Sequence, residues 1–325
     1  MKTLLAMGFF MVAVAADDRP SLLIVDGAAG SAEYAAQFHR WAEQWKQTAK
    51  QAGAELTSIG ETKEEGASDL DRLRAFLAQK AGDGQKPLWI VLIGHGTYDG
   101  REAKFNLRGP DVTDLQLSEW LTPIKRPVAM LDCTSASAPF LNRLSGPNRV
   151  IVTATRSGNE LNFARLGEYL AGAFADSGAD LDKDGQVSLL EAFLTASKRV
   201  GEYYRTHSQL ATEHALLDDN GDHLGTPADW FRGVHATRRA KDGAPLDGIR
   251  AHQFHLIPSD RERGMSDADR QRRDQLEQSL AALRDQKSKL GEEEYYKQIE
   301  PLLVELARIY GKLQPASSSS GFTGK

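Results

Sequence analysis

Short apolar runs alternate with amphipathic segments through the first half of the chain. Most of these runs are apolar throughout, which is typical of strands covered on both faces of a sheet. The runs expected to form strands are residues 21–27, 54–60, 87–94, 127–133 and 149–155. The segments expected to form helices are residues 32–53, 68–80, 113–120 and 138–145. Such alternation predicts an α/β fold with a mostly parallel sheet between helix layers and right-handed crossovers.

Local motifs support several of these elements. Ser68 and Thr113 each stand three residues before an acidic or amide side chain, which predicts a capped helix start. Residues 105–112 contain Gly and Pro between two apolar positions, which favours a short hairpin. Aromatic residues at helical spacing in the first helix are expected to face the core; they are Tyr34, Phe38, Trp41 and Trp45.

The second half is mainly helical. Residues 162–214 show helical spacing interrupted by an acidic loop, whereas residues 236–264 are polar and rich in Gly and Pro, as in a linker or covering loop. Residues 265–313 carry regularly spaced Leu and Ile, interrupted at Gly291 and Pro301, which predicts a C-terminal α-helical hairpin or coiled coil that self-associates or packs on the main domain. Residues 314–325 are expected to be disordered.

The N-terminus predicts export. Residues 1–16 combine a Lys, an apolar stretch shorter than a membrane span and an Ala-x-Ala pattern, as in a secretory signal peptide. The main domain then covers residues 17–235, and the mature protein is expected to be secreted or periplasmic, with no membrane span. The net charge of −5 and the dispersed basic residues leave no footprint for nucleic acid.

One histidine and the single cysteine of the 325 residues stand at the ends of two predicted strands. His95 follows residues 87–94, and Cys133 ends residues 127–133. Since ligands bind at the carboxyl ends of parallel strands, the two side chains are expected at one edge of the sheet. A thiolate beside an imidazole is a nucleophile with its acid/base. Gly96 has no side chain, so its N–H and that of Cys133 can approach a substrate carbonyl as an oxyanion hole.

The two blocks WIVLIG-His95-Gly96 and PVAMLD-Cys133 resemble the caspase-like clan of cysteine peptidases, which includes legumains, caspases, gingipains and the GPI-anchor transamidase. The resemblance spans residues 21–233 and is greatest to exported bacterial legumain-like peptidases. It implies a caspase-like α/β/α sandwich, peptide or protein substrates, catalytic His95 and Cys133, and Gly96 in the oxyanion hole.

The sequence departs from legumains at two places. Leu131 stands where legumains and caspases have a Glu or Gln of the specificity pocket, so a preference for Asn or Asp does not carry over. Legumains also assist the histidine with an Asn after the first strand, whereas Asp26 or Ser31 would take that role here. The candidate pocket residues are Thr155, Arg156, Ser157 and Glu160.

Residues 180–191 fit every position of a twelve-residue EF-hand loop, with the sharp turn at Gly185. The expected ligands are Asp180, Asp182, Asp184, Gln186, Ser188 and Glu191. Oxygen ligands without His or Cys select calcium over zinc. The alternative is a solvated acidic turn that caps the following helix.

A second acidic run offers Asp218, Asn220 and Asp222. It resembles the start of a calcium loop but has His223 at the glycine position and Asp229 at the closing position. A second, supporting metal site and an Asx-rich turn are both consistent with it.

These observations predict an exported, calcium-stabilised cysteine endopeptidase. Two alternatives remain open: a calcium-binding scaffold of the same fold without turnover, and a transamidase-type acyl transferase.

Overall fold

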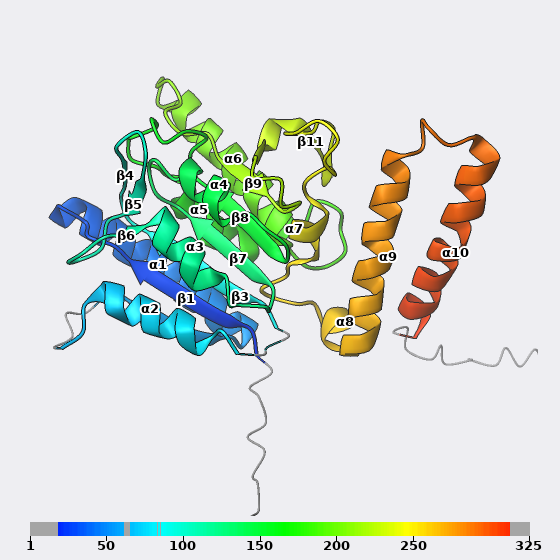
Figure 1. The fold of residues 1–325 in the computed structure, drawn as a ribbon, viewed down its shortest axis with the longest axis horizontal. Helices are drawn as coiled ribbons and strands as arrows, with labels where there is room; N and C mark the ends of the chain where they lie inside the picture. Colours follow the sequence, from blue (N-terminus) through cyan, green and yellow to red (C-terminus); the bar gives the residue numbers. More distant parts are fainter. Residues whose placement is uncertain (1–18, 62–65, 83, 85, 313–325) are drawn as a thin grey trace, which may run out of the picture.

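The computed structural model of the chain describes residues 19–61, 66–82, 84 and 86–312. The expected signal segment and C-terminal tail lie outside the described residues. A seven-stranded sheet lies between two layers of helices, and a pair of long helices stands beside it (Figure 1). The predicted α/β class with a mostly parallel sheet is confirmed.

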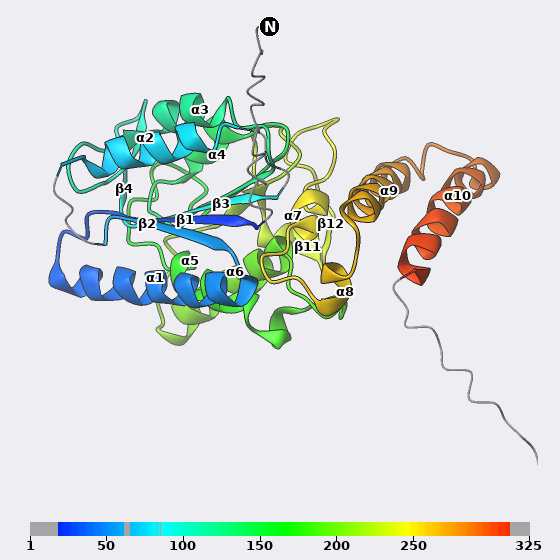
Figure 2. The same cartoon turned by 90° about the horizontal axis from the view of Figure 1, so that it is seen from below.

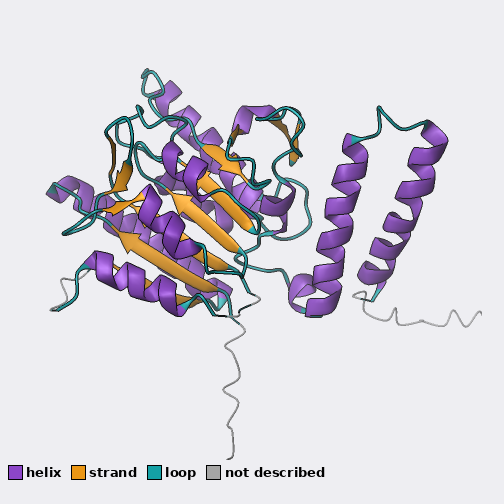
Figure 3. Cartoon of the chain, in the orientation of Figure 1, coloured by secondary structure: helices purple, strands orange, loops and turns teal. Residues whose placement is uncertain are grey.

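The strands of the central sheet, drawn in orange in Figure 3, have the order β10-β9-β8-β7-β3-β1-β2. Its five parallel strands fall on the predicted runs: β1 (Ser21–Asp26), β2 (Glu55–Ile59), β3 (Leu88–Ile93), β7 (Val128–Asp132) and β8 (Arg149–Thr153). The sequence analysis missed two short antiparallel strands at one edge, β9 (Leu216–Asp218) and β10 (Thr226–Pro227).

Helices cover both faces of this sheet (Figure 2). One layer contains α1 (Ala32–Ala52), α5 (Leu166–Phe174) and α6 (Leu189–Thr206). The other contains α2 (Asp69–Gln79), α3 (Asp114–Leu121) and α4 (Ala138–Leu144). Alternate residues of each strand enter opposite layers: along β7, Leu131 packs with the α1 layer and Met130 with the α2 layer. Each apolar run therefore contributes to two cores, and the predicted core positions Phe38, Trp41 and Trp45 are buried.

Small elements complete the domain. A three-stranded antiparallel sheet follows His95, and its second and third strands form the predicted hairpin. It contains β4 (Gly96–Tyr98), β5 (Ala103–Phe105) and β6 (Val112–Thr113). Beyond α5 lie η1 (Ser177–Ala179), η2 (Ala228–Trp230), β11 (Phe231–Arg232) and β12 (His235–Ala236).

Residues 236–264 contain two short helices, α7 (Ile249–Gln253) and α8 (Asp260–Arg263). Phe254 and Leu256, between these helices, are buried in the core of the α1 layer. The segment therefore covers the main domain and is anchored to it by apolar packing.

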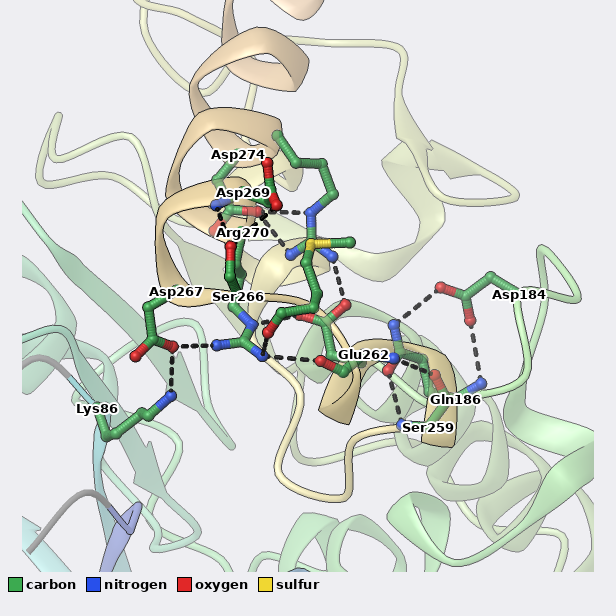
Figure 4. Close-up of polar contacts among 12 residues, drawn as sticks. Lys86, Asp184, Gln186, Ser259, Glu262, Ser266, Asp267, Asp269, Arg270 and Asp274 are labelled. Carbon is green, nitrogen blue, oxygen red and sulfur yellow. Dashed lines mark hydrogen bonds and ion pairs between the residues drawn. The ribbon is translucent and has the colours of Figure 1, made fainter. Parts of the chain in front are cut away.

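Two helices, α9 (Asp267–Asp285) and α10 (Glu292–Gly311), form a hairpin with its own small apolar core. Helix α10 continues through Pro301. Polar contacts join the start of α9 to the main domain, among them Lys86 Nζ to Asp267 Oδ1 at 2.8 Å (Figure 4). Within the described residues, no helix has both the length and the apolar character required to cross a bilayer.

Candidate active site and acidic loops

His95 and Cys133 follow neighbouring parallel strands. Leu92 of β3 pairs with Asp132 of β7, and the N–H of Cys133 donates to the carbonyl of Leu92 at 3.1 Å. The alternation of both strands directs His95 and Cys133 toward the α1 layer, as it does for Leu131, two residues before Cys133. The register thus brings the two predicted residues to the same edge and the same face of the sheet.

The imidazole of His95 lies in an aromatic cluster. Tyr34 and Phe38 of α1 meet its ring edge to face, with centroids 4.8 and 5.2 Å away. Its Nε2 lies 3.2 Å from the carbonyl oxygen of Ala29, which can only accept. Nε2 therefore carries the proton of the neutral ring, and Nδ1 keeps the lone pair that a base requires.

The partner of His95 differs from the one the sequence suggested. Ser31 accepts the N–H of Tyr34 and caps helix α1. Asp26 lies close to the charged groups of Glu61 and Arg108, and burial raises its pKa to about 7. A backbone carbonyl, that of Ala29, takes the orienting role instead. Residue types could not reveal this because every residue offers a carbonyl.

Cys133 is buried, with 1% of its surface exposed. Its Cβ packs against Gly167 of α5, where an added Cβ would lie 3.0 Å away and would also meet Trp41 at 2.9 Å. Burial, reinforced by the carboxylates of Asp132 and Glu213, raises the pKa of the thiol far above its usual range. In this conformation the cysteine is a protonated core residue.

Gly96 joins the loop after β3 to the loop after β7. Its N–H donates to Ser135 Oγ at 3.3 Å, and that hydroxyl donates to the Gly96 carbonyl at 3.1 Å. A Cβ at this position would lie 2.1 Å from the carbonyl oxygen of Ser135, so only glycine fits. Both N–H groups expected to form an oxyanion hole, those of Gly96 and Cys133, therefore have protein partners here.

The structure separates the four candidate pocket residues. Thr155 is fully buried, and its hydroxyl accepts the N–H of Ala138 in the first turn of α4. Arg156, Ser157 and Glu160 lie in the loop after β8, where the carboxylate of Glu160 accepts the Arg156 N–H at 3.0 Å. Thr155 thus supports a helix, and the other three belong to one loop.

Sequence reasoning missed His214, which precedes β9. Because β9 is antiparallel to β8, its first residue lies at the carboxyl edge of the parallel strands. His214 Nδ1 is 2.6 Å from Glu160 Oε1, and its N–H donates to Glu160 Oε2 at 3.2 Å. The EHALLDD stretch is conspicuous in the sequence, but a three-residue strand gives too little periodicity to reveal its direction.

Glu213 was missed as well. It is 3% exposed and accepts the N–H groups of Arg165 and Leu166 at the start of α5. Burial is the largest cause that raises its pKa to about 7. Beside it, Phe163 and Arg165 help to line a surface depression of about 430 Å³. The Phe163 ring lies 6.1 Å from that of His95, so this depression borders the candidate site.

Residues 180–191 form a closed acidic loop before α6. Ligand oxygens of Asp180, Asp182 and Asp184 lie within 4.8 Å of one another. Glu191 is buried at the closing position, where its Oε1 accepts the Leu181 N–H at 2.7 Å. This convergence of carboxylate oxygens fits a hard cation such as calcium.

Two further ligand positions contact the C-terminal segment. Ser188 caps α6 in a reciprocal box with Glu191 and forms an isolated β-bridge with His255. The side chain of Gln186 accepts the N–H of Ser259, so the loop contacts the segment before α9 (Figure 4). Nε2 of His252, in α7, lies 2.9 Å from Asp182 Oδ2, so α7 also contacts the loop.

The second acidic run forms the turn after β9. Asp218 Oδ1 accepts the N–H of Gly221 at 3.0 Å, and Asn220 Oδ1 accepts the N–H of Asp222 at 2.8 Å. The turn lies at the opposite edge of the sheet from His95.

Comparison with known proteins adds little to this geometry. No family model and no curated protein sequence matches the chain. Among solved structures, the chain is similar to the Drosophila initiator caspase Dronc, with a TM-score of 0.43 and 13% identity over 64% of this chain and 82% of that one. It is also similar to caspase-1 from Spodoptera frugiperda, with a TM-score of 0.40 and 9% identity over 62% and 86%.

Proposed function

We propose that the chain is an exported cysteine endopeptidase that hydrolyses peptide bonds in peptide or protein substrates through Cys133 and His95. One observation carries the proposal: the β3–β7 register sets these residues at adjacent strand ends and on one face, with Gly96 against the loop that follows Cys133. The short caspase-like blocks of the sequence agree with it.

The proposed reaction begins when Nδ1 of His95 takes the thiol proton of Cys133. The thiolate attacks the carbonyl carbon, and the C–N bond breaks as the imidazolium gives its proton to the leaving amine. Water, deprotonated by His95, then attacks the thioester and releases the acid and the thiol. During both additions, the N–H groups of Gly96 and Cys133 stabilise the oxyanion, at typically about 3 kcal/mol per donor.

The described conformation is, in this proposal, a resting state. The thiol is covered by α1 and α5, the N–H of Gly96 is held by Ser135, and the N–H of Cys133 is held by the Leu92 carbonyl. Attack requires the loop that begins at Cys133 to move outward and release all three groups. The depression beside Phe163 and the loop of Arg156, Ser157 and Glu160 border this site and are proposed to receive the substrate.

We propose further that the loop 180–191 binds calcium and stabilises the fold. Its converging carboxylates repel one another without a cation. Calcium is expected to raise the unfolding temperature of the wild type. Glu191→Gln, which keeps the side-chain shape, is expected to lose most of that increase.

Labelling of the single cysteine by an electrophilic peptide probe tests the catalytic assignment, with and without calcium. Covalent labelling of the native chain that is absent in Cys133→Ala and reduced in His95→Gln is expected. Peptide cleavage is likewise expected to be highest in the wild type, lower in His95→Gln and absent in Cys133→Ala. Cleavage that survives Cys133→Ala would refute the proposal, and calorimetry shows whether each variant is folded.

The buried thiol favours a second candidate, a calcium-binding scaffold of the same fold without turnover. It predicts that the probe labels Cys133 only after unfolding. An added amine acceptor in the cleavage assay distinguishes hydrolysis from transamidation, because transfer would give an amide product.

A further inference from the structure

The turn after β9 repeats the backbone pattern of the loop 180–191. In that loop, Asp180 Oδ1 accepts the N–H of Lys183, three residues later, at 2.7 Å. Asp218 Oδ1 accepts the N–H of Gly221, also three residues later, at 3.0 Å. Lys183 and Gly221 both adopt left-handed backbone, with φ of 64° and 80°. The first and fourth positions therefore correspond.

The third and fifth positions correspond as well. Asn220 Oδ1 accepts the N–H of Asp222, and Asp222 Oδ1 accepts the N–H of Leu224, both at 2.8 Å. The matching pairs in the first loop are Asp182 with Asp184, and Asp184 with Gln186. Each side chain thus turns its oxygen toward the inside of the turn.

His223 occupies the sixth position, where the sequence lacks the expected glycine. Its φ is 70°, close to the 91° of Gly185 in the first loop. The sharp turn is therefore made without glycine. Contacts of His223 with Asn142 and Ser145 hold this backbone in place.

A distant residue supplies the closing carboxylate. In the first loop, Glu191 Oε1 accepts the N–H groups of the second and third positions. In the second turn, Asp247 Oδ1 accepts the N–H groups of Asp219 and Asn220 at 3.0 and 3.2 Å. The sequence spacing pointed to Asp229, which lies in η2. Asp247, which comes from the covering segment, makes the contacts expected of the closing residue.

One buried oxygen lacks a well-aligned donor. In the first loop, Asp180 Oδ2 accepts the N–H of Gly185. In the second, the corresponding N–H of His223 donates to Ser145 Oγ, and the Ser145 hydroxyl is a neighbour of the Asp218 carboxyl. Asp218 is 1% exposed; its Oδ1 accepts the Gly221 N–H, and its Oδ2 has no hydrogen bond of good geometry within the described part of the chain. One neutral hydroxyl offsets little of the desolvation of a buried carboxylate oxygen, which favours a cation as its ligand.

Negative charge accumulates around this oxygen. Asp218, Asp219 and Asp247 are each at least 95% buried. Arg250 contacts the carbonyl of Asp219, and its single guanidinium offsets only part of the charge that three ionised carboxylates carry.

We propose that residues 218–224 and Asp247 form a second site for a hard divalent cation, with calcium as its ligand. The donors are carboxylate and amide oxygens of Asp218, Asn220 and Asp222, the carbonyl of Leu224, and Asp247. Calcium accepts six to eight such oxygens, whereas magnesium retains water and requires a stricter geometry. In the first loop, three carboxylates lie within 4.8 Å of one another, those of Asp180, Asp182 and Asp184. Within the described residues, Asp218, Asp222 and Asp247 form no such group, so calcium is expected to bind more weakly at the second site than at the first.

Equilibrium dialysis with calcium alone, on the full mature chain, tests the site by stoichiometry. The wild type is expected to bind two ions per chain. Glu191→Gln should remove one ion and leave the second turn occupied, whereas Asp218→Asn should remove the other. Asp229→Asn is the matched control, because it changes the residue that spacing alone selects, and it should bind as the wild type does.

The outcomes separate the two loops. If the wild type binds one ion and Glu191→Gln binds none, the second site is overturned. The same holds if folded Asp218→Asn and folded Asp247→Asn each retain two ions. A single ion that survives Glu191→Gln and is lost in Asp218→Asn would support the second site and refute the first. The wild-type stoichiometry is informative even if a variant fails to fold, since two bound ions require both sites and no bound ion excludes both.

Discussion

Two glycines of helix α5 offer a matched test of how Cys133 is packed. Gly167 lies against the sheet, where an added Cβ would be 2.9 Å from a ring carbon of Trp41 and 3.0 Å from the Cβ of Cys133. At Gly172, on the same helix, such a Cβ would meet no atom of the described residues within 4 Å beyond its chain neighbours and the backbone of its own helix. The substitution to Ala is chemically identical at both positions. Only the surroundings of the added methyl group differ.

The expected effects have opposite signs. In the helix interior, Gly172→Ala should raise the free energy of unfolding by about 1 kcal/mol, because Ala loses less backbone entropy than Gly. Gly167→Ala gains less because it stands in the first turn, and the clash costs about 1–3 kcal/mol, as for other overpacked cores. Gly167→Ala should therefore be about 1–4 kcal/mol less stable than Gly172→Ala, the clash cost and the smaller helix gain taken together.

Urea denaturation of the two variants and the wild type measures this difference. Alkylation of Cys133 under native conditions provides a second measurement, since displacement of its Cβ should expose the thiol and speed the reaction in Gly167→Ala alone. If Gly167→Ala stabilises the protein as much as Gly172→Ala and leaves alkylation unchanged, α5 does not cover the cysteine as described.

Three further predictions concern other parts of the molecule. The pKa of Glu213 is raised from 4.5 to about 7, so the folded protein binds this proton more tightly than the unfolded chain does. The free energy of unfolding therefore falls as the pH rises between these two values. In urea titrations, Glu213→Gln should remove up to about 3 kcal/mol of this pH dependence. Gly96→Ala should abolish probe labelling and cost more than about 3 kcal/mol, because its Cβ overlaps the Ser135 carbonyl. Pro301→Ala should restore a helical hydrogen bond and increase amide protection in α10, measured by hydrogen exchange.

The sequence predicted the parts of the fold that depend on local patterns. Apolar runs located the five parallel strands, and the motifs at Ser68 and Thr113 located the starts of α2 and α3. The alignment of the two strand ends that precede His95 and Cys133 also followed, because a parallel sheet brings its carboxyl ends to one edge. Strands β9 and β10 were missed, since three and two residues give no periodicity.

The state of the candidate site was not predictable from local patterns. Phe38 and Trp41 were expected in the core, but nothing in their spacing indicates that they lie over His95 and Cys133. The burial of the thiol results from packing between α1, α5 and β7, which are separated in sequence. Likewise, Asp247 closes the second turn from 29 residues beyond Asp218, outside the twelve-residue spacing of the motif.

Strand β9 connects the surroundings of the buried thiol with the second acidic turn. At one end, Glu213 caps α5 over the cysteine, and His214 binds Glu160 at the edge of the candidate site. At the other end, Asp218 begins the second acidic turn. A cation at the proposed second site would hold this end of β9, and the alkylation rate of Cys133 with and without calcium measures whether that constraint reaches the other end of the strand.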